Sequence, residues 1–190
     1  MNIIETPVRH GFQDQVMEAS QGLFDRLLGL ALGILPMRTL PAHDLTLLST
    51  MDLLREVHPG GDVVILTDNL DKRIYGNKRF LETLREALRQ EVQVSIIFDV
   101  AKSINPEDTL RVLREASTYS KTLDRAGGLS VYSTSETVRY PFMVVDRRHL
   151  RVEQMLADMR PSFTLFDSSK NALQLLSRTD SLIQHAKQVI

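Results

Sequence analysis

The spacing of apolar positions predicts two helices before residue 61. Leucines and other apolar residues give the segment 12–35 a broad apolar face, although three glycines interrupt it. Each glycine weakens a helix by up to about 1 kcal/mol relative to alanine, but also lets another helix approach closely. Asp44 is placed to cap a second helix over 45–56, and the turn 58–61 (HPGG) separates this part from the rest of the chain. We therefore expect residues 1–60 to form a helical N-terminal extension.

From residue 62 onward, short apolar runs alternate with amphipathic segments. The apolar runs predict strands at 62–68, 92–99 and 129–133, followed by a hairpin of strands 141–146 and 149–154. The amphipathic segments predict helices at 77–90, 108–125 and 170–188. Strand–helix–strand connections of this length favour parallel pairing with right-handed crossovers. The pattern therefore predicts an α/β domain over residues 61–190.

Composition excludes several classes of protein. With 190 residues, 43% of them hydrophobic and 25% charged, the chain has the balance of one ordinary globular domain with an appendage. The formal net charge is −1, so no overall field favours nucleic acid or an acidic membrane. The absence of cysteine excludes thiol catalysis, disulfides and thiolate metal sites.

The longest apolar run, 27–37, has eleven residues. A membrane-spanning helix needs roughly 20, and the N-terminus lacks the apolar core of a signal peptide. We therefore expect a cytoplasmic protein without a membrane span. The helix over 12–35 then serves as buried core, as part of a subunit interface, or as a docking helix for a protein partner.

Three predicted strands end in an aspartate, namely Asp68, Asp99 and Asp146. Ligands gather at the carboxyl ends of parallel strands, so Asp68 and Asp99 are candidate ligands of a divalent metal. The alternative is that each aspartate is a turn residue. The chain has no phosphate-binding glycine loop, no nucleophile elbow, and no pair of histidines at zinc-ligand spacing. We therefore expect no cofactor.

Four arginines lie close together in sequence around the predicted hairpin: Arg139, Arg147, Arg148 and Arg151. Forked guanidinium groups bind phosphates, and the nearby Tyr132 and Tyr140 offer rings for stacking. These arginines are the candidate ligand-binding residues. In the alternative interpretation they pair with the nearby acids Glu136, Asp146 and Glu153.

The order of these segments resembles a single phospholipase D-like domain over residues 60–188. The resemblance lies in VVILTDNLDKRIYGNKRFLETLREALRQEVQVSIIFD, then LSVYS, PFMVVDRRHLRVEQ and RPSFTLFDSSKNALQLLSRTDSLIQHA. It implies a mixed sheet flanked by helices. It also implies a homodimer, because members of that superfamily pair two motifs across a twofold axis.

The catalytic motif of that superfamily, HxKxxxxD, is degenerate here. Its His and Lys point to one face of a strand, where one attacks phosphorus and the other neutralises the phosphate. Counting back from Asp146 places Arg139 at the His position and Pro141 at the Lys position. A later Asn-Phe pair is replaced by Ser162-Phe163. The resemblance therefore implies the fold but not the activity.

Our first hypothesis is a non-catalytic phospholipase D-like binding or assembly module, similar to short bacterial versions that lack the catalytic pair. It would contact nucleic acid or another phosphate-bearing ligand. One alternative is a phosphodiesterase or nuclease with rearranged residues, using His149, Asp146 and Arg151. The same alternative includes a metal site at Asp68 and Asp99. Another alternative is a protein–protein adaptor that docks through 12–35.

Overall fold

A computed structural model of the chain describes residues 42–122, 127–153 and 162–190. The chain divides into two compact units, residues 1–39 and Leu40–Ile190, and the described residues all belong to the second. The helix predicted over 12–35 lies outside the described residues. No helix within the described ranges is long and apolar enough to cross a membrane.

Helices and strands alternate along the first half of this unit, and strands dominate the second half. The helices are α2 (Ala42–Arg55), α3 (Lys72–Tyr75), α4 (Lys78–Arg89), α5 (Pro106–Lys121) and α6 (Ser169–His185). The strands are β1 (Asp62–Thr67), β2 (Gln93–Asp99), β3 (Leu129–Thr134), β4 (Phe142–Val145), β5 (His149–Glu153), β6 (Ser162–Leu165) and β7 (Lys187–Gln188).

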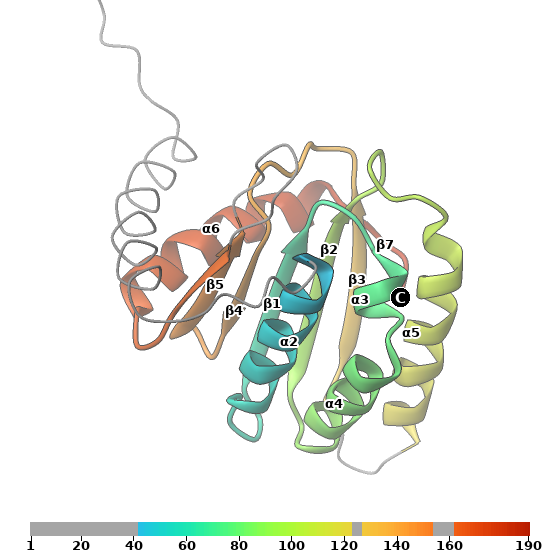
Figure 1. Cartoon of the computed structure of the whole chain (residues 1–190), viewed down its shortest axis with the longest axis horizontal. Coiled ribbons are helices and arrows are strands. Elements are labelled where there is room, and N and C mark those ends of the chain that lie inside the picture. The colour runs from blue at the N-terminus through green and yellow to red at the C-terminus, as the bar shows by residue number, and fades with distance from the viewer. Residues whose placement is uncertain (1–41, 123–126, 154–161) are drawn as a thin grey trace, which may run out of the picture. The chain divides into compact units, whose positions relative to one another are not determined.

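Within the described residues, the seven strands form one sheet in the order β6-β5-β4-β1-β2-β3-β7 (Figure 1). The central strands β1, β2 and β3 pair in parallel, as their helical connections predict. All other pairs are antiparallel, and the hairpin of β4 and β5 extends the sheet from β1. The expected mixed sheet flanked by helices is therefore confirmed.

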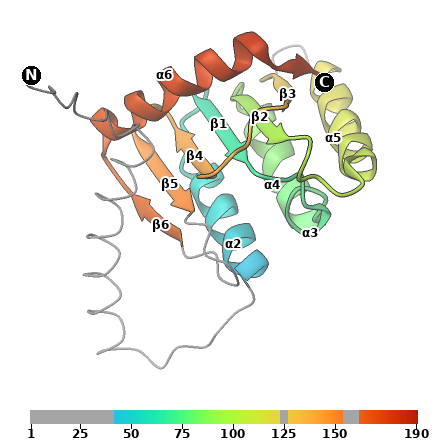
Figure 2. The same cartoon turned by 90° about the horizontal axis from the view of Figure 1, so that it is seen from above.

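The sheet separates two layers of helices, with α6 on one face and α2 to α5 on the other (Figure 2). Alternate residues of each strand point to opposite faces, so Ile65, Ile96 and Met143 join one large core cluster with α2, α4 and α5. Leu66, Ile97 and Val144, which point to the other face, are also buried, and α6 contacts β3, β4 and β5 on that second face. Both faces of the sheet are therefore covered.

Helix α2 is part of the core of this unit. Its apolar residues Leu47, Met51 and Leu54 are buried and belong to the same cluster as the strands. The predicted division of the chain at residue 60 falls within this compact unit. The turn that follows α2 leads directly into β1 and brings α2 close to β4.

Three short elements were not predicted from the sequence. Helix α3 is a single turn whose N-cap, Asp71, accepts a hydrogen bond from Arg73 N–H. The C-terminal helix ends at His185 rather than at 188, because the chain beyond it pairs with β3 as strand β7. Strand β6 lies at the edge of the sheet and, among the described residues, pairs only with β5. Such short segments carry too few residues for a periodic pattern, so pairing with the sheet defines β6 and β7.

Candidate functional site

The positions that correspond to the motif's His and Lys lie at the amino end of β4, beside the carboxyl end of β1. The amide N–H of Glu153 donates to the carbonyl of Pro141 at 2.8 Å, and Phe142 pairs with Leu66. Continuing this register by one residue places Pro141 between Thr67 on β1 and Glu153 on β5. Residues at one register position share a face of the sheet, so these three mark where the motif's Lys would lie.

A buried ion pair fills the space beside this position. Arg151 and Glu153 are two residues apart on β5, so both point to the face covered by α2. Their side chains are 2% and 4% exposed, and Arg151 Nη2 lies 2.8 Å from Glu153 Oε1. Arg151 Nη1 also donates to the carbonyl of Thr46 and to Ser49 Oγ on α2, at 3.2 and 2.9 Å. Arg151 is therefore an internal residue and not part of an exposed anion-binding surface.

Tyr75 of α3 adds a neutral phenol to the same region. Burial raises the pKa of Tyr75 to about 12, and the nearby Glu153 carboxylate acts in the same direction. A hydrogen bond with Thr67 and the charge of Arg151 oppose this rise in the pKa. The ring packs edge-on against Phe80 with centroids 5.5 Å apart. The place of the motif's catalytic groups is thus occupied by a packed, internally paired cluster.

Asp68 directly follows β1 and Asp99 is the last residue of β2, as predicted, but both are buried. Asp99 Oδ1 accepts the N–H of Ala101 at 2.9 Å and Oδ2 accepts that of Val138 at 3.3 Å. Asp68 accepts a hydrogen bond from the side chain of Asn69 at 3.4 Å. Among the described residues, no group of three or more acidic or histidine side chains is arranged to hold a metal ion. Asp99 instead joins the loops that follow β2 and β3.

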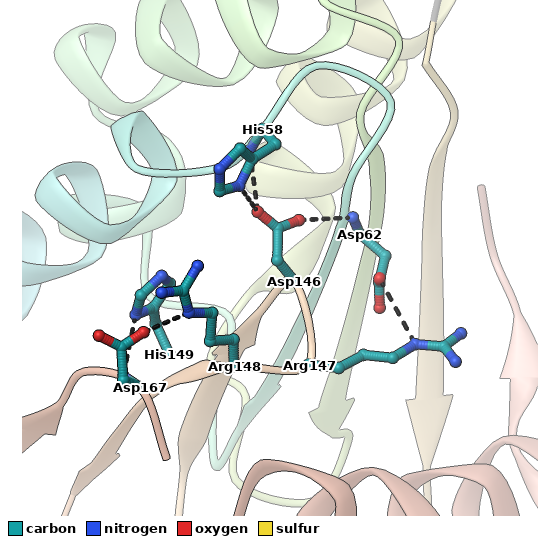
Figure 3. Close-up of polar contacts among 7 residues, drawn as sticks. All are labelled: His58, Asp62, Asp146, Arg147, Arg148, His149 and Asp167. Atoms are coloured by element: carbon teal, nitrogen blue, oxygen red, sulfur yellow. Dashed lines mark hydrogen bonds and ion pairs between the residues drawn. The ribbon is translucent and has the colours of Figure 1, made fainter. Parts of the chain in front are cut away.

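At the other end of β4, Asp146 connects two turns that are far apart in sequence. Its Oδ2 accepts hydrogen bonds from the backbone N–H of His58 at 2.8 Å and from His58 Nδ1 at 2.7 Å (Figure 3). Its Oδ1 accepts the N–H of Asp62 at 3.2 Å. Asp146 and Arg147 both have positive φ, 52° and 55°, which closes the tight turn between β4 and β5. The surviving aspartate of the motif therefore has a structural role in this chain.

The two arginines of this turn pair with acids from other segments. Arg147 Nε lies 3.6 Å from an Asp62 carboxylate oxygen at the start of β1. Arg148 Nε donates to Asp167, which precedes α6. The backbone N–H of Asp167 donates to Nδ1 of His149 at 3.3 Å. His149 is buried at the first position of β5, which leaves it poorly placed as a replacement nucleophile.

The four candidate arginines do not form one surface. Arg139 is exposed before β4, whereas Arg147 and Arg148 are exposed after it. Position 141 and Asp146 are five residue steps apart along β4, which corresponds to about 16 Å. The alternative interpretation paired these arginines with acids close in sequence. Among the described residues, the pair of Arg151 with Glu153 agrees with it. Arg147 and Arg148 instead pair with acids from distant segments.

Two groups in these regions were missed from the sequence. Tyr75 lies on α3, a helix too short to be recognised from a repeating pattern. His58 and its partner Asp146 are 88 residues apart, and nothing in the sequence connects them. The pairing of Arg151 with Glu153 had a signal, because residues two apart on a strand share a face.

No family model matches the chain, and no curated protein matches it by sequence. Solved structures do resemble it. The phospholipase D family member Nuc from Salmonella typhimurium is 9% identical with a TM-score of 0.56, and the match covers 74% of this chain and 88% of that one. NucT from Helicobacter pylori is 11% identical with a TM-score of 0.50, covering 76% of this chain and 91% of that one.

TrmBL2, described as an archaeal chromatin protein with a novel mode of DNA binding, is 12% identical with a TM-score of 0.57. That match covers 93% of this chain and 66% of TrmBL2. At such low identity, the resemblance concerns the arrangement of helices and strands, which here is phospholipase D-like. Any activity has to be argued from the residues of this chain.

Proposed function

Given the phospholipase D-like fold, we propose that this chain is a non-catalytic module that binds nucleic acid through exposed arginines. The observation that carries the proposal is the register position shared by Thr67, Pro141 and Glu153. A phosphohistidine mechanism needs a nucleophilic imidazole and a cation at this place. A proline stands at the Lys position instead, and the buried Arg151–Glu153 pair lies beside it.

The binding part of the proposal rests on the exposed arginines at the two ends of β4. Arg147 and Arg148 lie on the turn between β4 and β5, and Arg139 lies before β4. Guanidinium groups on an exposed turn suit contacts with the phosphates of a nucleic acid backbone. The similar structures include an archaeal chromatin protein described as binding DNA, which supports a phosphate-bearing ligand.

The test is a titration of the full chain with end-labelled single- and double-stranded oligonucleotides, followed on native and denaturing gels. A shift that weakens steeply with salt, with the oligonucleotide intact, supports the proposal, because phosphate contacts release counterions. Shortened oligonucleotide overturns the non-catalytic part. The absence of any shift overturns the nucleic-acid part and favours a protein–protein adaptor.

Charge-reversal variants locate the contact. Arg147→Glu/Arg148→Glu should abolish the shift, whereas Arg139→Glu tests the other end of β4. The matched control is Arg111→Glu/Arg114→Glu on α5, since both arginines are exposed and pair with carboxylates there. Equal losses in the control and in the turn variant would mean that only the overall charge matters.

We also propose that the chain is a cytoplasmic homodimer and that the segment 12–35 contributes to its interface or docks to a protein partner. That segment lies outside the described residues, so the proposal rests on its apolar pattern alone. Light scattering on the full chain and on a chain lacking residues 1–39 tests it. A dimer that becomes a monomer after truncation supports the proposal, and an unchanged mass contradicts it.

A further inference from the structure

Three carboxylates lie at the turn between β4 and β5. Each contacts a histidine or arginine side chain through the ring or guanidinium nitrogen that lies closest to the backbone. Asp146 holds His58 through Nδ1, Asp62 approaches Arg147 at Nε, and Asp167 holds Arg148 at Nε (Figure 3). Carboxylates placed behind a ligand-binding side chain fix its orientation and leave its outer nitrogen atoms free.

His58 is oriented on two sides. A carboxylate only accepts hydrogen bonds, so the contact between Asp146 and the imidazole puts a hydrogen on Nδ1. The same carboxylate oxygen accepts the backbone N–H of His58, which also fixes the backbone from which the side chain extends. The His58 side chain is 67% exposed. Its second nitrogen, Nε2, is therefore available to a ligand, with the ring held in one orientation.

Arg148 has the same arrangement. Its Nε donates to Asp167, while in the described part of the chain neither of its terminal amino groups donates a hydrogen bond. The side chain is 49% exposed. Figure 3 shows Arg148 and His58 on the same side of the turn, whereas Arg147 extends to the other side. With a hydrogen on Nε2 as well, the His58 ring and the Arg148 guanidinium would present two oriented donors on one side of the turn, which suit the oxygen atoms of a phosphate group.

We infer that His58 and Arg148 form a phosphate subsite at this turn, which binds one backbone phosphate of the nucleic acid. The inference rests on the proposed function and adds His58, which no motif identifies, as a ligand-contacting residue. In the proposed complex Nε2 of His58 also carries a hydrogen and donates it to the phosphate, as do the terminal amino groups of Arg148. The subsite lies at the opposite end of β4 from the place of the degenerate catalytic motif.

The test compares oligonucleotide affinity for the wild-type chain, His58→Gln and Arg148→Gln, measured by fluorescence anisotropy over a series of salt concentrations. Each variant should weaken binding about two- to fivefold, as expected for an exposed ionic contact. Each should also lower the slope of log affinity against log salt by about one. His58→Lys, which supplies a cation at this position, should retain most of the affinity, and the control Arg111→Gln should leave it unchanged.

A structural role of His58 would lower stability without a change in the salt slope, so the melting temperature of each variant is measured alongside. As a direct readout, the Nε2 resonance of His58 in ¹⁵N-labelled protein should shift on addition of the oligonucleotide. If the wild-type chain does not bind oligonucleotide, the proposed function fails. If it binds and His58→Gln retains both the affinity and the salt slope, the subsite is wrong while the proposed function stands.

Discussion

Asp146 accepts hydrogen bonds from both the backbone and the imidazole of His58, and thereby joins the turn before β1 to the turn after β4. The two residues are 88 positions apart in sequence. The carboxylate is largely covered, with 13% of the side chain exposed, so its hydrogen bonds are only partly in competition with water. This contact fixes how the hairpin of β4 and β5 meets the rest of the sheet.

Replacement of Asp146 by alanine should lower the free energy of unfolding by about 1–3 kcal/mol. The variant leaves the partly buried N–H of Asp62 and the exposed N–H of His58 without their acceptor, and an unpaired group that is partly buried carries this cost. Urea unfolding measures the loss. Asp108→Ala is the control, since its ion pair with Lys72 is exposed to solvent and should contribute little to stability. A loss for Asp146→Ala no larger than for the control would contradict this role.

A side chain at position 61 should destabilise the fold as long as Asp146 is present. A Cβ at this position would lie 2.0 Å from Asp146 Oδ1 and 2.8 Å from the carbonyl oxygen of His58. Gly61→Ala should therefore cost about 1–3 kcal/mol through forced displacement of the turn. Because the nearest clash is with the carboxylate, Gly61→Ala should cost less when Asp146 is already alanine. A double-mutant cycle in urea measures this coupling, and strictly additive losses would exclude it.

The buried pair of Arg151 and Glu153 should cost more when broken than when removed. Arg151→Met leaves a carboxylate that is 4% exposed without its cation, which should cost roughly 3–5 kcal/mol. In Arg151→Met/Glu153→Leu neither charge remains, so the loss should be smaller than in the single variant. Thermal and urea unfolding measure the stability of the single and the double variant relative to the wild type. A double variant less stable than the single one would mean that the pair stabilises the fold by itself.

Tyr75 should make stability sensitive to alkaline pH. Its pKa is raised to about 12 in the folded chain, whereas an unfolded tyrosine titrates near 10. Stability from the neutral phenol is therefore fully present below pH 10 and is lost as the pH rises through 12. Tyr75→Phe has no hydroxyl to ionise, so between pH 10 and 12 it should lose less stability than the wild type. Equal losses in both proteins would show that other groups control alkaline unfolding.

Divalent metal should not stabilise the chain through Asp68 and Asp99. Both carboxylate oxygens of Asp99 already accept backbone N–H groups, so a metal ion would have to displace them. Neither magnesium nor a chelator should shift the melting temperature, since a ligand that binds the folded state raises it. Asp99→Ala, in contrast, should lower it. A rise with magnesium that Asp99→Ala abolishes would restore the metal hypothesis.

The main helices and strands could be predicted from local patterns. Strand β1 was expected at 62–68 and found at Asp62–Thr67, because a continuous apolar run suits a strand buried on both faces. Helix α4 begins where Asn77 caps it, accepting the N–H of Arg79, and its buried residues recur at helical spacing. The tight turn at Asp146 was also expected, although not the reason that the aspartate is needed there.

The sequence by itself determined the order of the longer elements, the parallel centre of the sheet and the absence of the His–Lys pair, because these depend on periodicity, connection length and residue identity. Only the tertiary structure decided what the charged residues do. It separated the four arginines, buried Arg151 against Glu153, and brought His58 to Asp146. The physical reason is that a polar side chain takes the partner that folding places nearest, and folding brings together residues that are distant along the chain.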